Sequence, residues 1–399
     1  MPTFILTLNA GSSSLKFAMF DADFMDGGKM LTVARGEIEN LDEAPHLMAR
    51  DADGNVLAER SWPKGQQETF EAVLEALLSF ADSNLAPGEL AAVGHRIVHG
   101  GADHIAPARV TDALMHELEA LIALDPLHMP HNLKPIEAVA RARPGLAQVA
   151  CFDTAFHHTM PPVARMVGLP RALGLRRYGF HGLSYESIAS SLAHQQPELA
   201  QGRVIVAHLG SGASLCAMDQ GRSIATTMGF SALDGLLMAT RCGTLDPGIV
   251  LYLARQGHSF GDIEDMLYHR SGLLGVSGMS GDIRDLVAST AKAAQEAVEL
   301  FTYRISTEVG ALASALGGLD GLVFTAGIGE HAPIIRAAVC ERLAWLGISL
   351  DTVANAANAD RISKSKGRVT VLAMKTDEEA VIAGHTYATL GMNTVPLGR

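Results

Sequence analysis

The stretch TLNAGSSSLKF, residues 7–17, follows the short apolar run Phe4-Ile5-Leu6 and leads into alternating apolar and polar residues. A second stretch, AHLGSGASL at residues 207–215, follows the apolar run Val204-Ile205-Val206 in the same way. Short apolar runs on both sides of a tip of small residues are typical of β-hairpins. The sequence therefore predicts a turn between two strands at each place.

The two hairpins share residues, although they lie far apart in the chain. Four identical pairs coincide when the stretches are aligned, namely Gly11 with Gly210, Ser12 with Ser211, Ala18 with Ala217 and Met19 with Met218. A repeat over such a distance indicates a duplicated domain.

A tip made of glycine and serine lets backbone N–H groups and hydroxyls converge on a phosphate. Lys16 adds a positive charge to the first tip. The alternative is that a Gly-Ser tip is only the easiest tight turn to build. The doubling favours phosphate binding, because two facing tips would clamp one nucleotide.

The composition indicates a globular protein of two domains, since 399 residues can bury a large core. No apolar run reaches the length of a membrane span and no signal peptide is recognisable, so we expect a cytoplasmic protein. A formal net charge of -12 argues against a nucleic-acid surface. An anionic small substrate is compatible with this charge if positive residues gather in one cleft. The four cysteines are scattered and indicate neither a zinc site nor a disulfide framework: Cys151, Cys216, Cys242 and Cys340.

The apolar patterns predict an α/β protein. We expect a small antiparallel sheet within residues 1–60, and further strands at 91–94, 148–152, 321–325 and 369–374. We expect helices at 69–78, 110–124, 136–143, 184–194 and 291–316, with two more opening near 282 and 380. Residues 125–132 contain two prolines and are predicted to form a rigid loop.

Two arginines are candidates for binding an anion. Arg96 stands at the end of a predicted strand beside a glycine pair, and Arg241 lies in a loop. A guanidinium matches a carboxylate or phosphate. Pairing with a structural carboxylate explains Arg96 equally well, and the sequence leaves both interpretations open.

Other polar residues stand where strands or turns end. Asp153 follows a predicted strand, the usual place for a catalytic group in an α/β sheet. His181 lies in a turn, and flanking prolines restrain His128. Gly327-Ile328-Gly329 would let a flat ligand approach the backbone. Glu378 and Glu379 are explained by helix capping alone.

Several familiar motifs are missing. The chain has no Walker A sequence, no complete G-x-G-x-x-G, no H-E-x-x-H and no nucleophile elbow. A nucleotide would therefore be held by the paired hairpins and not by a P-loop.

Five motifs resemble the acetate/propionate kinase family and occur in the family's order along essentially the whole chain. They are NAGSSSLK (9–16), HRIVHGG (95–101), FDTAFH (152–157), RYGFHG (177–182) and FTAGIGE (324–330). The resemblance implies the duplicated, actin-like (ribonuclease H-like) ASKHA fold with a central nucleotide cleft, and a homodimer. It also implies reversible phosphoryl transfer from ATP to a short-chain carboxylate. The expected domains are residues 1–152 with 380–399 on the acyl and phosphate side, and 153–379 on the nucleotide side.

The resemblance also implies roles for individual residues. Asn9 and Glu378 would hold magnesium, for which manganese can substitute. The catalytic residues would be Arg96, His128, Asp153, His181 and Arg241. Arg96 would also bind the substrate, with Val98, Phe180 and Ala232 lining the acyl pocket. The nucleotide would meet Ser12, Ser14, Lys16, His208, Leu209, Gly210, Ser211, Gly212, Asp282, Ile283, Arg284, Gly327, Ile328, Gly329, Glu330 and His331.

The chemical requirements of phosphoryl transfer agree with these roles. Transfer through a loose transition state needs positive charge and donors around the phosphoryl oxygens, and a metal. A carboxylate is already a nucleophile at neutral pH, so we expect Asp153 to orient Arg96 or a metal-bound water and not to act as a strong base.

The sequence departs from the family pattern at five positions: Met129, Ser211, Ala232, Thr244 and His331. Ala232 replaces a proline, which predicts that an acyl chain longer than acetate is tolerated. The alternatives are a kinase for propionate, butyrate or another short acid, a simple ATPase, an ATP-binding scaffold without turnover, and an actin-like polymer. The paired arginines and Asp153 speak against a scaffold, and the lack of an assembly insertion speaks against a polymer.

Overall fold

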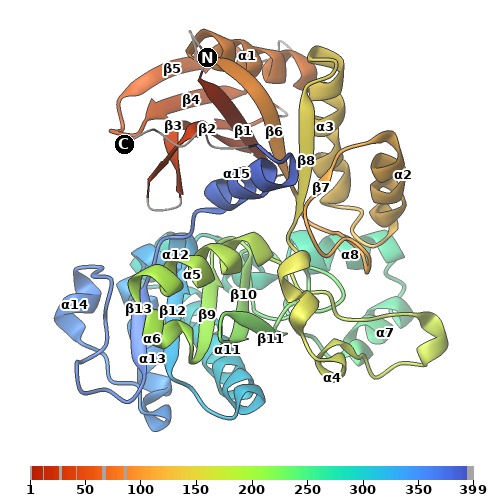
Figure 1. Cartoon of the computed structure of the whole chain (residues 1–399). Coiled ribbons are helices and arrows are strands. Elements are labelled where there is room, and N and C mark those ends of the chain that lie inside the picture. Colours follow the sequence, from red (N-terminus) through yellow and green to blue (C-terminus); the bar gives the residue numbers. More distant parts are fainter. Residues whose placement is uncertain are drawn as a thin grey trace. The chain divides into compact units, whose positions relative to one another are not determined.

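The computed structural model describes residues 2–11, 13–26, 29–41, 43–64, 69–84 and 88–392. The chain divides into two compact units. Unit 1 consists of Met1–Ala155 and Asp377–Arg399, and unit 2 of Phe156–Thr376 (Figure 1). The domain boundaries expected from the sequence stay a prediction.

Within the described residues, unit 1 contains an eight-stranded mixed sheet in the order β5-β4-β3-β2-β1-β6-β8-β7. Its strands are β1 (Thr3–Ala10), β2 (Leu15–Asp26), β3 (Lys29–Glu39), β4 (His46–Asp51), β5 (Val56–Ser61), β6 (Glu89–Ile97), β7 (Ala108–Arg109) and β8 (Ala147–Phe152). Its helices are α1 (Phe70–Asn84), α2 (Asp112–Ala120), α3 (Met129–Ala142) and α15 (Glu378–Thr389), and a 3-10 turn η1 spans Leu121–Ala123.

Helices cover both faces of the central strands of unit 1, which explains why β1 is apolar at nearly every position. Alternate residues of a strand face opposite sides of the sheet. Leu6 and Leu8 pack with α1 and α3 in one cluster, whereas Ile5 packs with Ala383 of α15 in another. Burial on both faces therefore places the ends of the parallel strands β1, β6 and β8 at fixed positions.

Within the described residues, unit 2 contains a five-stranded sheet in the order β11-β10-β9-β12-β13. Its strands are β9 (Arg203–Leu209), β10 (Ala213–Asp219), β11 (Arg222–Thr226), β12 (Gly321–Thr325) and β13 (Thr370–Ala373). Its helices are α4 (Pro162–Arg165), α5 (Gly182–Gln195), α6 (Pro197–Ala200), α7 (Pro247–Arg255), α8 (Phe260–His269), α9 (Gly272–Ser277), α10 (Ile283–Ala288), α11 (Lys292–Leu316), α12 (Ala326–His331), α13 (Pro333–Arg342) and α14 (Thr352–Ala356). The 3-10 turns are η2 (Ala155–Thr159), η3 (Arg171–Leu173) and η4 (Ala344–Leu346).

The strand order β3-β2-β1-β6-β8 of unit 1 repeats as β11-β10-β9-β12-β13 in unit 2. In each unit the first two pairings are antiparallel and the last two are parallel. The chain runs from β8 of unit 1 to α5, which packs on β9 of unit 2, and from β13 of unit 2 to α15, which packs on unit 1. The α/β class and the duplication expected from the sequence are confirmed.

The two predicted hairpins are confirmed, with one difference between them. The first tip closes with the bond from Gly11 N to Ser14 O (2.8 Å), and the second with that from Gly210 N to Gly212 O (3.0 Å). The first tip is longer by one residue, because Ala10 pairs with Leu15 whereas Leu209 pairs with Ala213.

Three element predictions were wrong in detail. The expected helix 110–124 begins at Asp112, because the Thr111 side chain accepts a hydrogen bond from Leu114 N, and it passes into η1 after Ala120. The expected loop 125–132 ends at Met129, where α3 begins. Pro130 is tolerated there because the first helical turn needs no N–H donor.

The third correction concerns the expected Gly-x-Gly turn, which is the short helix α12. Glu330 Oε1 accepts a hydrogen bond from Ala326 N at its start (3.0 Å).

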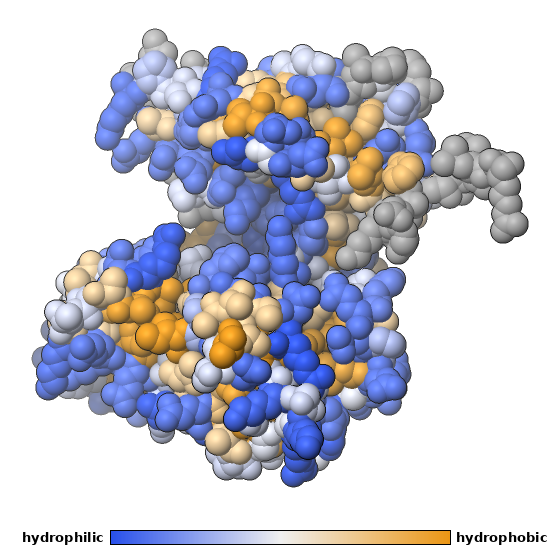
Figure 2. All heavy atoms as spheres, turned by 90° about the vertical axis from the view of Figure 1, so that its left-hand side faces the viewer, coloured by the Kyte–Doolittle hydropathy of each residue, from blue (hydrophilic) through white to orange (hydrophobic). Residues whose placement is uncertain are grey.

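The face drawn in Figure 2 is mostly hydrophilic on unit 2, with separate groups of apolar side chains between the polar ones. Among the described residues, no helix combines the length and apolar character needed to cross a membrane.

Candidate active site

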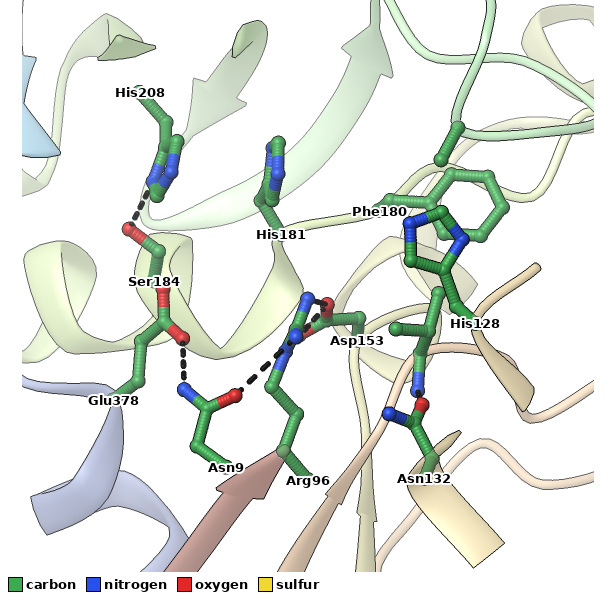
Figure 3. Close-up of polar contacts among 12 residues, drawn as sticks. Asn9, Arg96, His128, Asn132, Asp153, Phe180, His181, Ser184, His208 and Glu378 are labelled. Carbon is green, nitrogen blue, oxygen red and sulfur yellow. Dashed lines mark hydrogen bonds and ion pairs between the residues drawn. The ribbon is translucent and has the colours of Figure 1, made fainter. Parts of the chain in front are cut away.

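Unit 1 gathers four polar side chains at one edge of its sheet. Asn9 lies near the end of β1, Arg96 near the end of β6 and Asp153 directly after β8, and Glu378 opens α15 (Figure 3). The carboxyl ends of parallel strands meet at the same edge, which is why α/β proteins place their ligand sites there. The parallel register of β1, β6 and β8 brings these residues together from distant parts of the chain.

Arg96 and Asp153 form a buried ion pair. Arg96 donates through Nε to Asp153 Oδ2 (3.0 Å) and through Nη2 to the same oxygen. Burial by itself lowers the pKa of Arg96, but the Asp153 carboxylate outweighs this effect and raises it. Asp153 Oδ1 is buried and has no hydrogen-bond partner among the described residues. The pair therefore presents an arginine of fixed orientation and one acceptor oxygen.

Asn9 links the ion pair to Glu378. Its Oδ1 accepts from Arg96 Nη1 (3.3 Å), and its Nδ2 donates to Glu378 Oε2 (3.2 Å). Burial, opposed by Arg96 and reinforced by the nearby carboxylates of Asp153 and Glu379, raises the pKa of Glu378 to about 7. A carboxyl group held in this way favours either a proton or a bound cation.

Glu378 and Glu379 lie in the first turn of α15, as expected for acidic residues at a helix N-terminus, but the capping side chain is that of another residue. Asp377 is the N-cap of α15 and accepts a hydrogen bond from Ala380 N (3.0 Å). Glu378 is thereby left to contact Asn9.

Asn132 of α3 joins the ends of β1 and β6 beyond their last paired residues, Leu8 and His95. Its side chain accepts from Val98 N (2.8 Å) and donates to Ala10 O (3.0 Å). Val98 itself is buried. The sequence analysis missed Asn132. Its spacing of four residues from His128, which places both on one face of a helix, is the signal that could have identified it.

The residues expected at the phosphates from the first hairpin differ in exposure. Lys16 opposes Asn9 in the antiparallel register and is exposed, and Ser14 is half-buried. Ser12, which we also expected at the phosphates, lies outside the described residues.

In unit 2, His181 has an unusual backbone and a short chain of hydrogen bonds. Its φ of 59° lies in the left-handed region, which is uncommon for residues other than glycine and often marks a functional site. Its Nδ1 contacts Ser214 Oγ (2.8 Å), which also contacts the Tyr185 hydroxyl. A Cβ atom at Gly212 would lie 3.2 Å from His181 Nε2, so the second tip approaches the imidazole closely.

His208, at the end of β9, stacks on His181. The ring centroids are 4.2 Å apart and the planes differ by 16°. His208 Nδ1 is hydrogen-bonded to Ser184 Oγ (2.7 Å), which holds the ring from α5 (Figure 3). The stack therefore fixes both imidazoles beside the second tip.

Unit 2 also contains a cavity of about 510 Å³ with a wall made largely of glycine, alanine and isoleucine. Eleven residues line it: Gly210, Ser211, Ala239, Gly281, Asp282, Ile283, Arg284, Gly327, Ile328, His331 and Ala332. A concave apolar pocket with a few polar groups at its rim is the usual form of a small-molecule site. The sequence analysis missed Ala239, Gly281 and Ala332, because small apolar residues carry no chemical signal.

Five of the unit 2 residues expected at the nucleotide do not line this cavity: His208, Leu209, Gly212, Gly329 and Glu330. Leu209 is buried in β9, and Gly329 is buried in α12. Glu330 is occupied in accepting hydrogen bonds from Ala326 N (3.0 Å) and Thr376 N (3.3 Å). His208 contacts Ser184, and Gly212 lies against His181.

The remaining predicted residues of unit 2 differ in burial, since Arg241 is half-buried and Thr244 is exposed. Phe180 and Ala232 are buried, and Arg241 Nη1 donates to Ala232 O (3.1 Å). Thr244 Oγ1 donates to Asp234 Oδ1 (3.0 Å), and Asp234 pairs with Arg177 (3.1 Å). In unit 1 the family departure at Met129 is explained by packing, since its side chain is buried beside Ile97 and Leu133.

Arg336 is a second residue that the sequence analysis missed. Its fully buried guanidinium donates to the carbonyls of Gly329 and Glu330 at the end of α12, and to Asn355 and Asn358. These contacts fix the helix that forms one wall of the cavity.

Comparison with protein families and curated proteins gives a consistent result. The model of the acetokinase family matches residues 4–384. An acetate kinase of Rhodopseudomonas palustris (strain TIE-1) is 51% identical over 394 residues, which cover 97% of this chain and 98% of that protein. An acetate kinase of Rhizobium meliloti is 46% identical over 392 residues, which cover 96% of this chain and 98% of that protein.

Solved structures agree with the sequence matches. A propionate kinase from Francisella tularensis subsp. tularensis SCHU S4 superposes with a TM-score of 0.86 at 33% identity, covering 96% of this chain and 98% of that one. An acetate kinase from Porphyromonas gingivalis superposes with a TM-score of 0.84 at 35% identity, covering 97% of this chain and all 100% of that one.

Proposed function

The chain belongs to the acetokinase family and is a kinase with a carboxylate acceptor, and from this premise we propose that it transfers the terminal phosphoryl group of ATP reversibly to acetate. The products would be acetyl phosphate and ADP. The observation that carries the proposal is the buried Arg96–Asp153 pair with Asn9 and Glu378 at one sheet edge. Such a cluster supplies a cation for an anionic substrate and oxygen ligands for a metal.

Arg96 would bind the carboxylate and the phosphoryl group in transfer. Its contacts with Asp153 and Asn9 use three of the five N–H groups of a guanidinium. The remaining N–H groups suit an oxyanion, and the ion pair fixes the plane of the fork before the substrate arrives. Asp153 would act as an orienting group, because acetate is ionised at neutral pH and needs no general base.

Magnesium fits the donor set of this cluster. Asn9 Oδ1, the Glu378 carboxylate and the partnerless Asp153 Oδ1 are oxygen donors, which this hard cation prefers. No group of three or more acidic, histidine or cysteine side chains in the described part of the chain could hold a metal by itself. Asn9 and Glu378 would therefore share the ion with substrate phosphates and water, as is usual for magnesium. When bound, the ion neutralises charge on the phosphate oxygens.

The nucleotide would occupy the cavity of unit 2. The glycine positions Gly210, Gly281 and Gly327 leave room for a flat base and sugar to lie against the backbone. Ser14 and Lys16 of the first tip would meet the phosphates. His128, His181 and Arg241 would donate to the phosphoryl group, where preorganised donors stabilise developing charge.

The acyl pocket would be formed by Val98, Phe180 and Ala232. Ala232 has a smaller side chain than the proline usual in the family, so we propose propionate as a second substrate. A propionate kinase among the similar structures is compatible with this idea.

The test is hydroxamate trapping of acyl phosphate from magnesium ATP with formate, acetate, propionate or butyrate. The expected result is product with acetate and propionate and no product without an acid. ATP hydrolysis that does not depend on added carboxylate would instead identify a simple ATPase. ATP binding without any product would favour a scaffold.

We also propose a cytoplasmic homodimer. Unit 2 exposes large apolar side chains in two segments, at Val163, Met166, Leu169 and Leu173, and at Leu251, Tyr252 and Phe260. Apolar surface of this kind is typical of protein interfaces. Sedimentation velocity of the purified protein tests the dimer, and a monomer at micromolar concentration would contradict it.

A further inference from the structure

Asp125 is a buried carboxylate of unit 1 that contacts His128 twice. Its side chain is 4% exposed, whereas the His128 side chain is 22% exposed. His128 Nδ1 lies 2.8 Å from Oδ1 and 3.1 Å from Oδ2. The backbone N–H of His128 also donates to Oδ1 (3.1 Å). Both groups lie in the segment between η1 and α3, within the predicted rigid loop 125–132.

A turn explains only part of this arrangement. Aspartate often accepts a hydrogen bond from a backbone N–H a few residues further on and so closes a turn. That role accounts for the bond from His128 N. It does not account for the imidazole, whose Nδ1 lies within hydrogen-bond distance of both carboxylate oxygens.

The charge of Asp125 determines which ring nitrogen carries the proton. Burial acts to raise the pKa of Asp125, but the hydrogen bond and charge of His128 outweigh it and lower the pKa, with a smaller contribution from His99. An ionised carboxylate can only accept, so His128 Nδ1 must be the donor. This assignment follows from the hydrogen-bond network.

The contact therefore fixes two properties of His128, the rotation of its ring and its tautomer. With Nδ1 turned to Asp125, Nε2 lies on the opposite side of the ring. The same logic operates where a carboxylate behind a catalytic or metal-bound histidine sets the orientation of the imidazole.

We propose that Asp125 is a positioning residue for phosphoryl transfer, which holds His128 so that Nε2 faces the transferring group. The proposal rests on the proposed function, in which His128 contacts that group. Asp125 itself does not touch the substrate and acts only through the imidazole.

The first experiment is a double-mutant cycle with Asp125→Ala and His128→Ala, read as kcat and KM for acyl phosphate formation. We expect Asp125→Ala to lower kcat roughly 10-fold, with KM for ATP and acetate changed less than about twofold. In the His128→Ala background the same substitution should have no further effect, because its target is gone. An equal loss in both backgrounds would overturn the proposal.

Asp125→Asn separates the turn from the ring. Asparagine closes the same kind of turn, but it is neutral and can present its amide N–H groups to Nδ1. We expect the variant to keep the wild-type melting temperature and to lose kcat about as strongly as Asp125→Ala. Wild-type kcat in Asp125→Asn would mean that the turn alone matters, and would overturn the proposal.

A second measurement does not depend on activity. Long-range nitrogen–proton NMR of histidine-labelled protein reports the tautomer of His128, with His128→Gln giving the assignment. We expect a proton on Nδ1 in the wild type and its loss in Asp125→Asn. A wild-type enzyme that forms no acyl phosphate would refute the proposed function, whereas an active enzyme with His128 protonated on Nε2 would refute only the role of Asp125.

Discussion

In unit 1 the ends of β1 and β6 carry Asn9 and Arg96, whereas in unit 2 the corresponding ends of β9 and β12 carry His208 and Thr325 and are followed closely by Gly210 and Gly327. The strand order and the directions of pairing are the same in both sheets. The same sheet edge thus presents an ion pair in unit 1, whereas in unit 2 it presents a histidine and, beyond it, glycine backbone. The duplicated units thus share their strand order, and they differ in the residues at the strand ends.

This difference between the units fits the two kinds of ligand proposed above. A small anion and a metal need fixed charges and oxygen donors, which Arg96, Asp153 and Glu378 provide in unit 1. A nucleoside needs a flat apolar space, which the glycine-lined cavity of unit 2 provides. Substitutions in the cavity of unit 2 should therefore change the kinetics of ATP more than those of acetate.

The largest effect is expected from Arg96→Ala. Acyl phosphate formation should fall on the order of 10³-fold, because the substitution removes a preorganised cation at the reacting groups. Leaving Asp153 buried without its partner should also destabilise the fold by about 3 kcal/mol. Hydroxamate trapping and urea unfolding measure the two effects.

The double variant Arg96→Ala/Asp153→Asn is the matched control for that experiment. It removes the unpaired charge, so it should recover most of the stability and none of the activity. Recovery of both, or of neither, would contradict the division between the two roles.

Gly327→Leu should weaken ATP binding and leave acetate binding unchanged. Nothing lies within 4 Å of the position where a Cβ would stand at Gly327, which lines the cavity, so the new side chain would fill the ligand's space. We expect KM for ATP to rise roughly 10- to 100-fold and KM for acetate to change less than about twofold.

Gly261→Leu is the control for this substitution. Gly261 is an exposed glycine in α8, is equally open and does not line the cavity. It should leave both KM values unchanged. A similar rise in the acetate KM of Gly327→Leu would show that the two ligands are not separable in this way.

The raised pKa of Glu378 predicts a pH effect on stability. Between an unfolded pKa near 4.5 and a folded pKa of about 7 the folded state binds more protons, so stability falls as pH rises through this window. The contribution is about 3 kcal/mol and should be absent in Glu378→Gln. Unfolding free energies of both proteins, measured without metal, give the difference directly.

Magnesium ions should oppose this loss, since they require the ionised carboxylate. The gain in melting temperature on adding magnesium and ATP should be larger at about pH 8 than at about pH 6, and Glu378→Gln should reduce it. An equal gain at both pH values would argue against Glu378 as a ligand.

The smallest effect is expected at Ala232. Propionate should be used within about 10-fold of acetate in kcat/KM, since one methylene is worth roughly 1–3 kcal/mol in an apolar pocket. Ala232→Val should disfavour propionate by a few-fold more than acetate. A strong preference of the wild type for acetate would contradict the proposed pocket.

The sequence was most informative where chemistry requires particular residues. The hairpin tips, the strand ends before Asp153 and Gly327, and the buried strands were all predicted, because apolar runs and glycines have direct local consequences. Asn132, Asp125 and Arg336 were missed or misread. Each acts through contacts with residues that are distant in sequence or lie in an irregular segment, so no local pattern announces them.

The two hairpin tips show which features the sequence alone does not specify. The shared glycines and serines by themselves established that a hairpin occurs twice, since small residues and flanking apolar runs leave few other structures open. Only the tertiary structure decided that the tips differ by one residue in length. It also decided that Glu378, in the first turn of its helix, contacts Asn9. Those outcomes depend on the register between strands and on the packing of α15, which are set by the whole core and not by any single stretch.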